Sequence, residues 1–141
     1  MKFELPDLAR IPHIASQFLV ELGHRKIFAF EAEMGTGKTT FILGLLKAMG
    51  IENPEGSPTY SLINTYNSPM YGKVNHLDLY RLRSEEEAYD IGIEELLYSN
   101  NEICFIEWAE KIESLLPMNT VFVKMHLQED GSRLIEVKLP E

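Results

Sequence analysis

The chain has 141 residues, of which 45% are hydrophobic and 25% are charged, as is typical of a globular protein with one core. Its formal net charge of −9 argues against a broad face that grips nucleic acid, because such binding depends on clustered lysine and arginine. The single cysteine, Cys104, excludes an intrachain disulfide, and no apolar run is long enough to cross a membrane. We therefore expect one cytoplasmic domain over residues 1–141.

The first half of the chain begins with a helical pattern and continues with a strand. Apolar residues recur at helical spacing between Ile11 and Leu22, and Gly23 follows as a helix stop. An apolar run at 26–31 predicts a strand. A glycine-rich loop follows, and a second helix is expected to extend to about Met49.

The second half predicts further strands and short helices. Ser84 and the three glutamates after it have the form of a capping box, so a helix is expected to start there and to be interrupted at Gly92. Residues 102–107 contain four consecutive apolar residues, as in a central strand covered on both faces. Two antiparallel hairpins and a short helix complete the pattern, over 61–67 with 73–80, 120–128 with 133–139, and 109–116. This order predicts an α/β fold with a mixed parallel and antiparallel sheet flanked by helices.

The glycine-rich loop after the first apolar strand carries the strongest functional signal. Residues 32–39 read Ala-Glu-Met-Gly-Thr-Gly-Lys-Thr, the pattern of a phosphate-binding loop. In such a loop the backbone N–H groups and Lys38 contact phosphate oxygens, and the Thr39 hydroxyl ligates Mg²⁺. Alanine replaces the more usual first glycine at Ala32, and we expect it to be tolerated if the backbone there keeps a negative φ. The motif predicts a P-loop nucleotide-binding fold.

Two acidic residues compete for the carboxylate position that a magnesium–nucleotide site needs. Asp78 ends an alternating strand, whereas Glu107 ends a fully apolar one, so burial favours Glu107 as the metal-binding or water-orienting acid. The alternative for Glu107 is a solvated carboxylate at a strand end. His76, Asp78 and Tyr80 share one face of their strand, and this spacing fits a stripe that serves the site as well as one that faces solvent.

Three further features have more than one interpretation. Ser57-Pro58-Thr59-Tyr60 predicts either a simple proline turn, which the sequence alone favours, or a switch-like segment that places the Thr59 hydroxyl near the γ-phosphate or metal. Trp108 fits a core or rim aromatic better than a stacking platform. The acidic run Glu85-Glu86-Glu87 fits a solvated helix face, with a docking surface for a basic partner as the alternative.

Four motifs, taken together, point to one known family. They are the phosphate loop with Thr39-Thr40, Ser57-Pro58-Thr59-Tyr60, His76-Leu77-Asp78-Leu79-Tyr80-Arg81 and Glu107-Trp108. In order and spacing, from about Ile27 to Trp108, they closely resemble the bacterial TsaE family (formerly YjeE), the ATPase of tRNA threonylcarbamoyladenosine synthesis. The last three motifs discriminate far better than the phosphate loop does.

The resemblance implies a cytoplasmic ATPase that binds ATP and Mg²⁺ and works with the TsaD and TsaB proteins. Those partners transfer the threonylcarbamoyl group to an adenosine beside the tRNA anticodon and are expected to hold the tRNA, so this chain does not perform the transfer itself. Carried over by motif, the catalytic residues are Lys38, Thr59, Asp78 and Glu107, and the metal-binding residues are Thr39 and Glu107. The implied nucleotide contacts are Glu33, Met34, Gly35, Thr36, Gly37, Lys38, Thr39, Thr40 and Trp108.

Two other functions fit the phosphate loop. A small-molecule kinase uses the same loop, although no segment here is available for an arginine-rich lid. A nucleotide-dependent assembly switch, in which hydrolysis is incidental, is the other alternative, and the missing Asn-Lys-x-Asp motif disfavours a GTPase. Glu33 stands where the TsaE family often has aspartate, so turnover is expected to differ if that carboxylate positions water or metal.

Overall fold

The computed structural model describes residues 1–33, 35–55 and 62–140. Its strands are β1 (Lys2–Leu5), β2 (Ile27–Ala32), β3 (Ile63–Ser68), β4 (Gly72–Asp78), β5 (Ile103–Glu107), β6 (Val121–Leu127) and β7 (Arg133–Lys138). Its α-helices are α1 (Ile11–Leu22), α2 (Lys38–Ala48), α3 (Glu85–Asp90) and α4 (Ile93–Tyr98), and its 3₁₀ helices are η1 (Leu8–Arg10) and η2 (Ala109–Leu115). Within this described part of the chain, no helix has both the length and the apolar character needed to cross a membrane.

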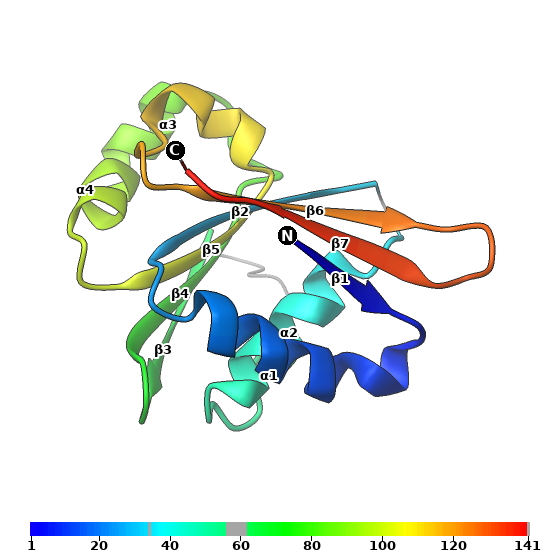
Figure 1. Ribbon diagram of the computed structural model, residues 1–141. Coiled ribbons are helices and arrows are strands. Elements are labelled where there is room, and N and C mark those ends of the chain that lie inside the picture. Colours follow the sequence, from blue (N-terminus) through cyan, green and yellow to red (C-terminus); the bar gives the residue numbers. More distant parts are fainter. Residues whose placement is uncertain (34, 56–61, 141) are drawn as a thin grey trace.

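The described strands form one mixed sheet in the order β1-β7-β6-β2-β5-β4-β3 (Figure 1). Four strands in the middle, β6, β2, β5 and β4, run parallel to one another. β3 pairs antiparallel with β4 at one side, and β7 and β1 add antiparallel pairs at the other. The predicted mixed parallel and antiparallel sheet is therefore confirmed.

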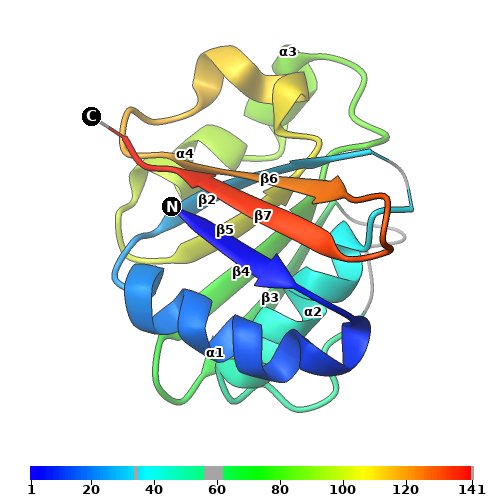
Figure 2. The same ribbon diagram turned by 45° about the vertical axis from the view of Figure 1, so that its right-hand side comes forward.

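Helices cover both faces of this sheet. α1 and α2 pack on one face, and α3, α4 and η2 lie on the other (Figures 1 and 2). The first core is rich in phenylalanine, with ring centroids of Phe18 and Phe28 5.8 Å apart and those of Phe28 and Phe105 5.3 Å apart. Alternate residues of β2 and β5 enter the two cores, and Cys104 is buried in the second. This double burial explains why both strands are continuous apolar runs in the sequence.

Most predicted elements lie within a few residues of the observed ones. The first helix coincides with α1, and both predicted hairpins form, as β3 with β4 and β6 with β7. The Ser84 hydroxyl accepts the Glu87 N–H at 3.2 Å, and Gly92 separates α3 from α4 with a φ of 79°. The predicted helix at 109–116 was wrong in type, because it is a 3₁₀ helix interrupted at Ile112, where φ is −130°.

Strand β1 was not predicted from the sequence. Its four residues are too few to establish an alternating pattern, and Leu5 is the one residue of the four that is buried. The strand forms because β7 offers a free edge, so that Phe3 lies opposite Ile135 and Leu5 opposite Arg133. A short strand of this kind depends on a partner more than 125 residues away, for which local sequence carries no signal.

Candidate nucleotide-binding site

The phosphate loop lies at the rim where the parallel strands end. β2 leads into the loop, and α2 begins directly after it at Lys38. In the sheet register Phe30 lies opposite Glu107, and Glu107 lies opposite Asp78, so the carboxyl ends of β2, β5 and β4 are side by side. Ligands of α/β sheets bind outside this rim. The structure thus brings the loop and both candidate acids to one place.

The backbone of the loop depends on its two glycines. Gly35 has a φ of 82° and Gly37 a φ of 95°, left-handed values that residues with a Cβ adopt only at a cost. Between them Thr36 is buried, and its hydroxyl and its N–H donate to the Glu33 carbonyl oxygen at 2.6 and 3.2 Å. Ala32 is the last residue of the extended strand β2 and is not among the residues with positive φ, so the condition for tolerating its methyl group is met.

A cavity of about 440 Å³ opens above the loop. This volume falls within the range of small-molecule sites, about 300–1,000 Å³. Its described lining contains most of the predicted nucleotide contacts and both candidate acids: Glu33, Gly35, Thr36, Gly37, Lys38, Thr39, Thr40, Asp78, Tyr80, Glu107 and Trp108. Two predicted site residues, Met34 and Thr59, and the segment 57–60 around Thr59 lie outside the described residues.

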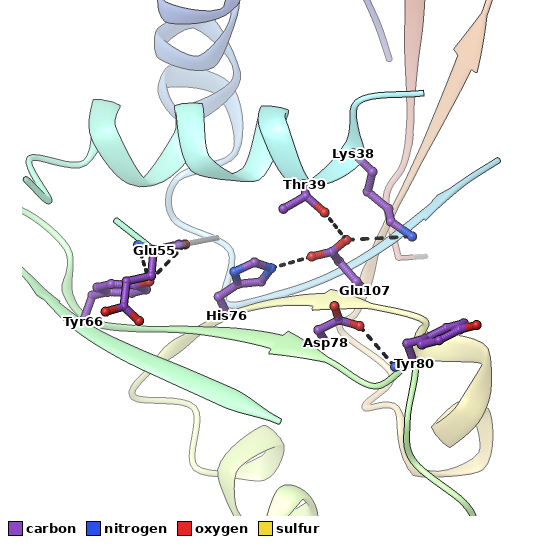
Figure 3. A network of polar contacts seen from close by, with 8 residues as sticks. All are labelled: Lys38, Thr39, Glu55, Tyr66, His76, Asp78, Tyr80 and Glu107. Atoms are coloured by element: carbon purple, nitrogen blue, oxygen red, sulfur yellow. Dashed lines mark hydrogen bonds and ion pairs between the residues drawn. The ribbon is translucent and has the colours of Figure 1, made fainter. Parts of the chain in front are cut away.

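Glu107 is buried at the centre of a polar network (Figure 3). Its Oε1 accepts the Thr39 hydroxyl at 2.7 Å and lies 3.9 Å from Lys38 Nζ, and its Oε2 lies 2.6 Å from His76 Nε2. Burial opposes ionisation, but the hydrogen bonds from His76 and Thr39, together with nearby positive charge, outweigh it and hold the pKa of Glu107 below its usual value. Glu107 is therefore an ionised carboxylate aimed at the phosphate loop, and it is not the solvated strand-end residue of the alternative interpretation.

His76 lies behind Glu107 and is fully buried. Because an ionised carboxylate can only accept hydrogen bonds, the His76 Nε2–H is the donor of this hydrogen bond and Glu107 Oε2 is the acceptor. Its Nδ1 has no hydrogen-bond partner among the described residues. From the sequence, His76 was predicted only as part of the polar stripe, because its contact with Glu107 depends on the register of β4 against β5.

The rest of the stripe lies at the mouth of the cavity. Asp78 lines the cavity and accepts the Tyr80 N–H at 3.1 Å. The Tyr80 ring lies 5.0 Å from the Trp108 ring, and Lys38 Nζ lies 4.9 Å from the centre of the same indole. Trp108 is thus a rim aromatic that contacts the loop lysine, and it has a left-handed φ of 62°. The stripe of His76, Asp78 and Tyr80 therefore faces the site, as in the first of its two interpretations.

The donor set of the cavity fits Mg²⁺. This ion prefers oxygen ligands and is commonly held by one or two carboxylates and by substrate phosphates. The Thr39 hydroxyl and the Glu107 carboxylate are adjacent, and Asp78 is close by on the neighbouring strand. No group of three or more His, Cys, Asp or Glu side chains that could hold a metal by itself occurs in the described ranges.

Comparison with known proteins shows the family. The family model described as threonylcarbamoyl adenosine biosynthesis protein TsaE matches residues 5–135, which include the loop, both strand-end acids and Trp108. The chain belongs to the TsaE family. The resemblance that the four motifs indicated is thereby confirmed.

Relatives of this TsaE chain cover nearly its whole length. The tRNA threonylcarbamoyladenosine biosynthesis protein TsaE of Treponema pallidum is 34% identical over 131 residues, which are 93% of this chain and 93% of that protein. The protein of the same name from Rickettsia bellii is 37% identical over 126 residues, 89% of this chain and 85% of that protein. The crystal structure of Bacillus subtilis YdiB superposes with a TM-score of 0.78 at 23% identity, covering 100% of this chain and 86% of that chain, and so has the same fold.

Proposed function

We propose that this chain is a Mg²⁺-dependent ATPase of tRNA threonylcarbamoyladenosine biosynthesis, acting with TsaD and TsaB without transferring the threonylcarbamoyl group itself. The main support for the proposal is the buried carboxylate of Glu107, which is hydrogen-bonded to Thr39 next to the phosphate loop and to the buried His76 on its other side. Membership of the TsaE family supports the pathway.

The arrangement of the loop supports nucleotide binding. α2 begins at Lys38, directly after the loop, so the positive end of its dipole would favour the β- and γ-phosphates there. Lys38 Nζ is 3.9 Å from Glu107 and is positioned to exchange that contact for phosphate oxygens. Thr39 and Glu107 would hold Mg²⁺, which supplies neutralisation of the phosphate charge.

Hydrolysis requires a water molecule directed at the γ-phosphorus. Carboxylates accept hydrogen bonds from such a water and orient its lone pair for attack. Of the acids that line the cavity, Glu107 and Asp78 lie opposite each other on β5 and β4, and we assign this role to that pair. The new bond joins the water oxygen to the γ-phosphorus while the bond from the γ-phosphorus to the bridging oxygen breaks. ADP and phosphate are released, and one proton of the water is released to solvent.

The charge of the chain supports assigning tRNA to the partners. With 13 Lys and Arg residues against 22 Asp and Glu residues, its field repels a polyanion. TsaD and TsaB would hold the tRNA and transfer the threonylcarbamoyl group in the cytoplasm, while ATP hydrolysis by this chain resets their complex.

Phosphate release by the Lys38→Ala protein tests the proposed site. We expect hydrolysis of Mg-ATP to fall about 100-fold or more, because a donor aimed at the reacting phosphate is lost. Lys73→Ala, which removes an exposed lysine from β4, is the matched control and is expected to retain the wild-type rate. Full activity in Lys38→Ala would refute the mechanism.

The same preparation separates the two alternatives. Consumption of ATP only in the presence of an added metabolite, with ADP and phosphorylated product in equal amounts, would indicate a kinase. Multiple rounds of tRNA modification with a non-hydrolysable ATP analogue would indicate an assembly switch. The ATPase proposal predicts phosphate release without any metabolite and no multiple-turnover modification with the analogue.

A further inference from the structure

Arg133 stands at a position where an alternating strand would normally carry an apolar residue. In β7, Ile135 and Val137 are buried in the core beneath α1 and α2. Residues two apart share a face of a strand, so Arg133 points to the same side of the sheet. Because β6 runs parallel to β2 and β7 returns antiparallel, β7 begins at the rim that holds the phosphate loop.

The Arg133 guanidinium joins the hairpin turn to the phosphate loop. Its Nε donates to the Thr36 carbonyl oxygen at 2.8 Å, across 97 residues of sequence. Its Nη1 donates to the Gly131 carbonyl oxygen in the turn between β6 and β7 at 3.3 Å. A Cβ placed on Gly37 would lie 3.5 Å from Arg133 Nε, so the side chain lies directly against the loop.

The hydrogen bond to Thr36 fixes one peptide plane of the loop. In a trans peptide the C=O of one residue and the N–H of the next point in opposite directions. When Arg133 holds the Thr36 carbonyl oxygen on the hairpin side, the Gly37 N–H is directed the other way. Thr36 and Gly37 both line the cavity. Gly37 has a left-handed φ, and because a glycine backbone can adopt many other conformations, the sequence of the loop alone does not hold this one.

Arg133 also adds positive charge where the site has little. Among the described residues that line the cavity, three are acidic (Glu33, Asp78 and Glu107) and one, Lys38, is basic. A polyphosphate entering this cavity meets net negative charge from the side chains. The positive charge of the Arg133 guanidinium, behind the loop, offsets part of this negative charge. Its interaction passes through a partly buried region, where screening by water is weaker.

We propose that Arg133 is a positioning residue that holds the phosphate loop in its nucleotide-binding shape from the C-terminal hairpin. The inference rests on the proposed nucleotide site and extends it to a residue outside every motif of the sequence. It requires that removal of Arg133 weakens the binding of any nucleotide with a β-phosphate, ADP as well as ATP, because the loop itself loses its preorganisation.

Calorimetric titration with Mg-ADP tests this directly, since no hydrolysis is involved. Arg133→Met is expected to raise the Kd at least tenfold, the effect of losing one hydrogen bond from a charged donor. The matched control is Lys138→Met, which removes the same charge from the same strand, at an exposed position on the opposite face. The control is expected to change the Kd less than twofold.

Thermal unfolding of the ligand-free variants and an Arg133→Lys protein complete the test. A purely structural contribution would lower the melting temperature and leave the Kd unchanged, which would overturn the inference. Arg133→Lys keeps the positive charge but lacks the planar guanidinium group, so it is expected to bind Mg-ADP several-fold more weakly than the wild type. This variant decides the question if Arg133→Met does not fold. Wild-type affinity in Arg133→Lys would overturn the inference, whereas no binding by the wild-type protein would overturn the proposed function with it.

Discussion

The two oxygens of Glu107 have different partners, and this asymmetry gives the residue its orientation. Oε1 faces Thr39 and Lys38, and Oε2 faces His76. A carboxylate fixed at one oxygen by a buried donor can present its other oxygen in a constant direction. We therefore expect His76 to orient Glu107, much as outer-shell partners orient metal ligands.

Substitution of His76 is predicted to lower both the free energy of unfolding and the rate of ATP hydrolysis. His76→Met removes the donor and leaves a buried carboxylate oxygen unpaired, at a cost of about 3 kcal/mol in the free energy of unfolding. Loss of the orienting contact is expected to reduce the hydrolysis rate about 10- to 100-fold. Urea unfolding and phosphate release measure the two effects.

His76→Gln is the matched variant, because its side-chain amide can place an N–H near the position of Nε2. It is expected to recover part of the stability and part of the rate. Equal rates for the Gln and Met variants would show that the hydrogen bond to Glu107 has no part in hydrolysis.

At the level of residues, the sequence predicted what depends on local spacing. Lys38 and Thr39 belong to a continuous motif, and Glu107 was preferred to Asp78 because an apolar run precedes it. The contacts of His76 and Arg133 could not be predicted in the same way, since each joins strands or loops far apart in sequence. The one available signal was Arg133 on the apolar face of an alternating strand.

Among the elements, α1 and α2 approach each other closely at Gly44. A Cβ built on Gly44 would lie 2.2 Å from Cγ2 of Ile11, well inside contact distance. Ile11 is buried and, as a β-branched residue, has few alternative rotamers. Gly44 therefore sets the distance between α2, which follows the phosphate loop, and α1, which packs against α2.

Gly44→Ala is predicted to destabilise the protein despite the better helix propensity of alanine. The propensity gain is about 1 kcal/mol, and overpacking against Ile11 costs about 1–3 kcal/mol, so we expect a net loss of about 1 kcal/mol. In an Ile11→Ala background the same substitution should instead be neutral or stabilising. Urea unfolding of the four proteins in this cycle measures the coupling, and an increase in stability for Gly44→Ala alone would contradict the packing argument.

Elements with a strong pattern were predicted, and elements that depend on a distant partner were not. The apolar runs of β2 and β5 and the glycines after α2 and α3 carry local signals, and these elements are observed close to their predicted bounds. β1 exists through its pairing with β7, and η2 is a 3₁₀ helix that is interrupted at the non-helical residue Ile112. Neither β1 nor η2 has a hydrophobic periodicity that would identify it in the sequence.

For the molecule as a whole, acidic residues outnumber basic ones, 22 against 13. The net charge is −9, and α3 begins with three consecutive glutamates at the end of the molecule away from α1 and α2. Such a field favours association with basic protein surfaces and disfavours direct contact with tRNA. This agrees with an ATPase that controls a complex in which other subunits hold the nucleic acid.

Phosphate release from Mg-ATP, measured with the protein alone and after addition of purified TsaD and TsaB, tests whether this chain is an ATPase controlled by those partners. We expect the two partners together to accelerate release, and Glu107→Ala to lose this acceleration because the carboxylate beside Thr39 is gone. Lys73→Ala, altered at an exposed residue of β4, should be accelerated like the wild type. Hydrolysis that is absent, or that is the same with and without the partners, would refute the proposed function.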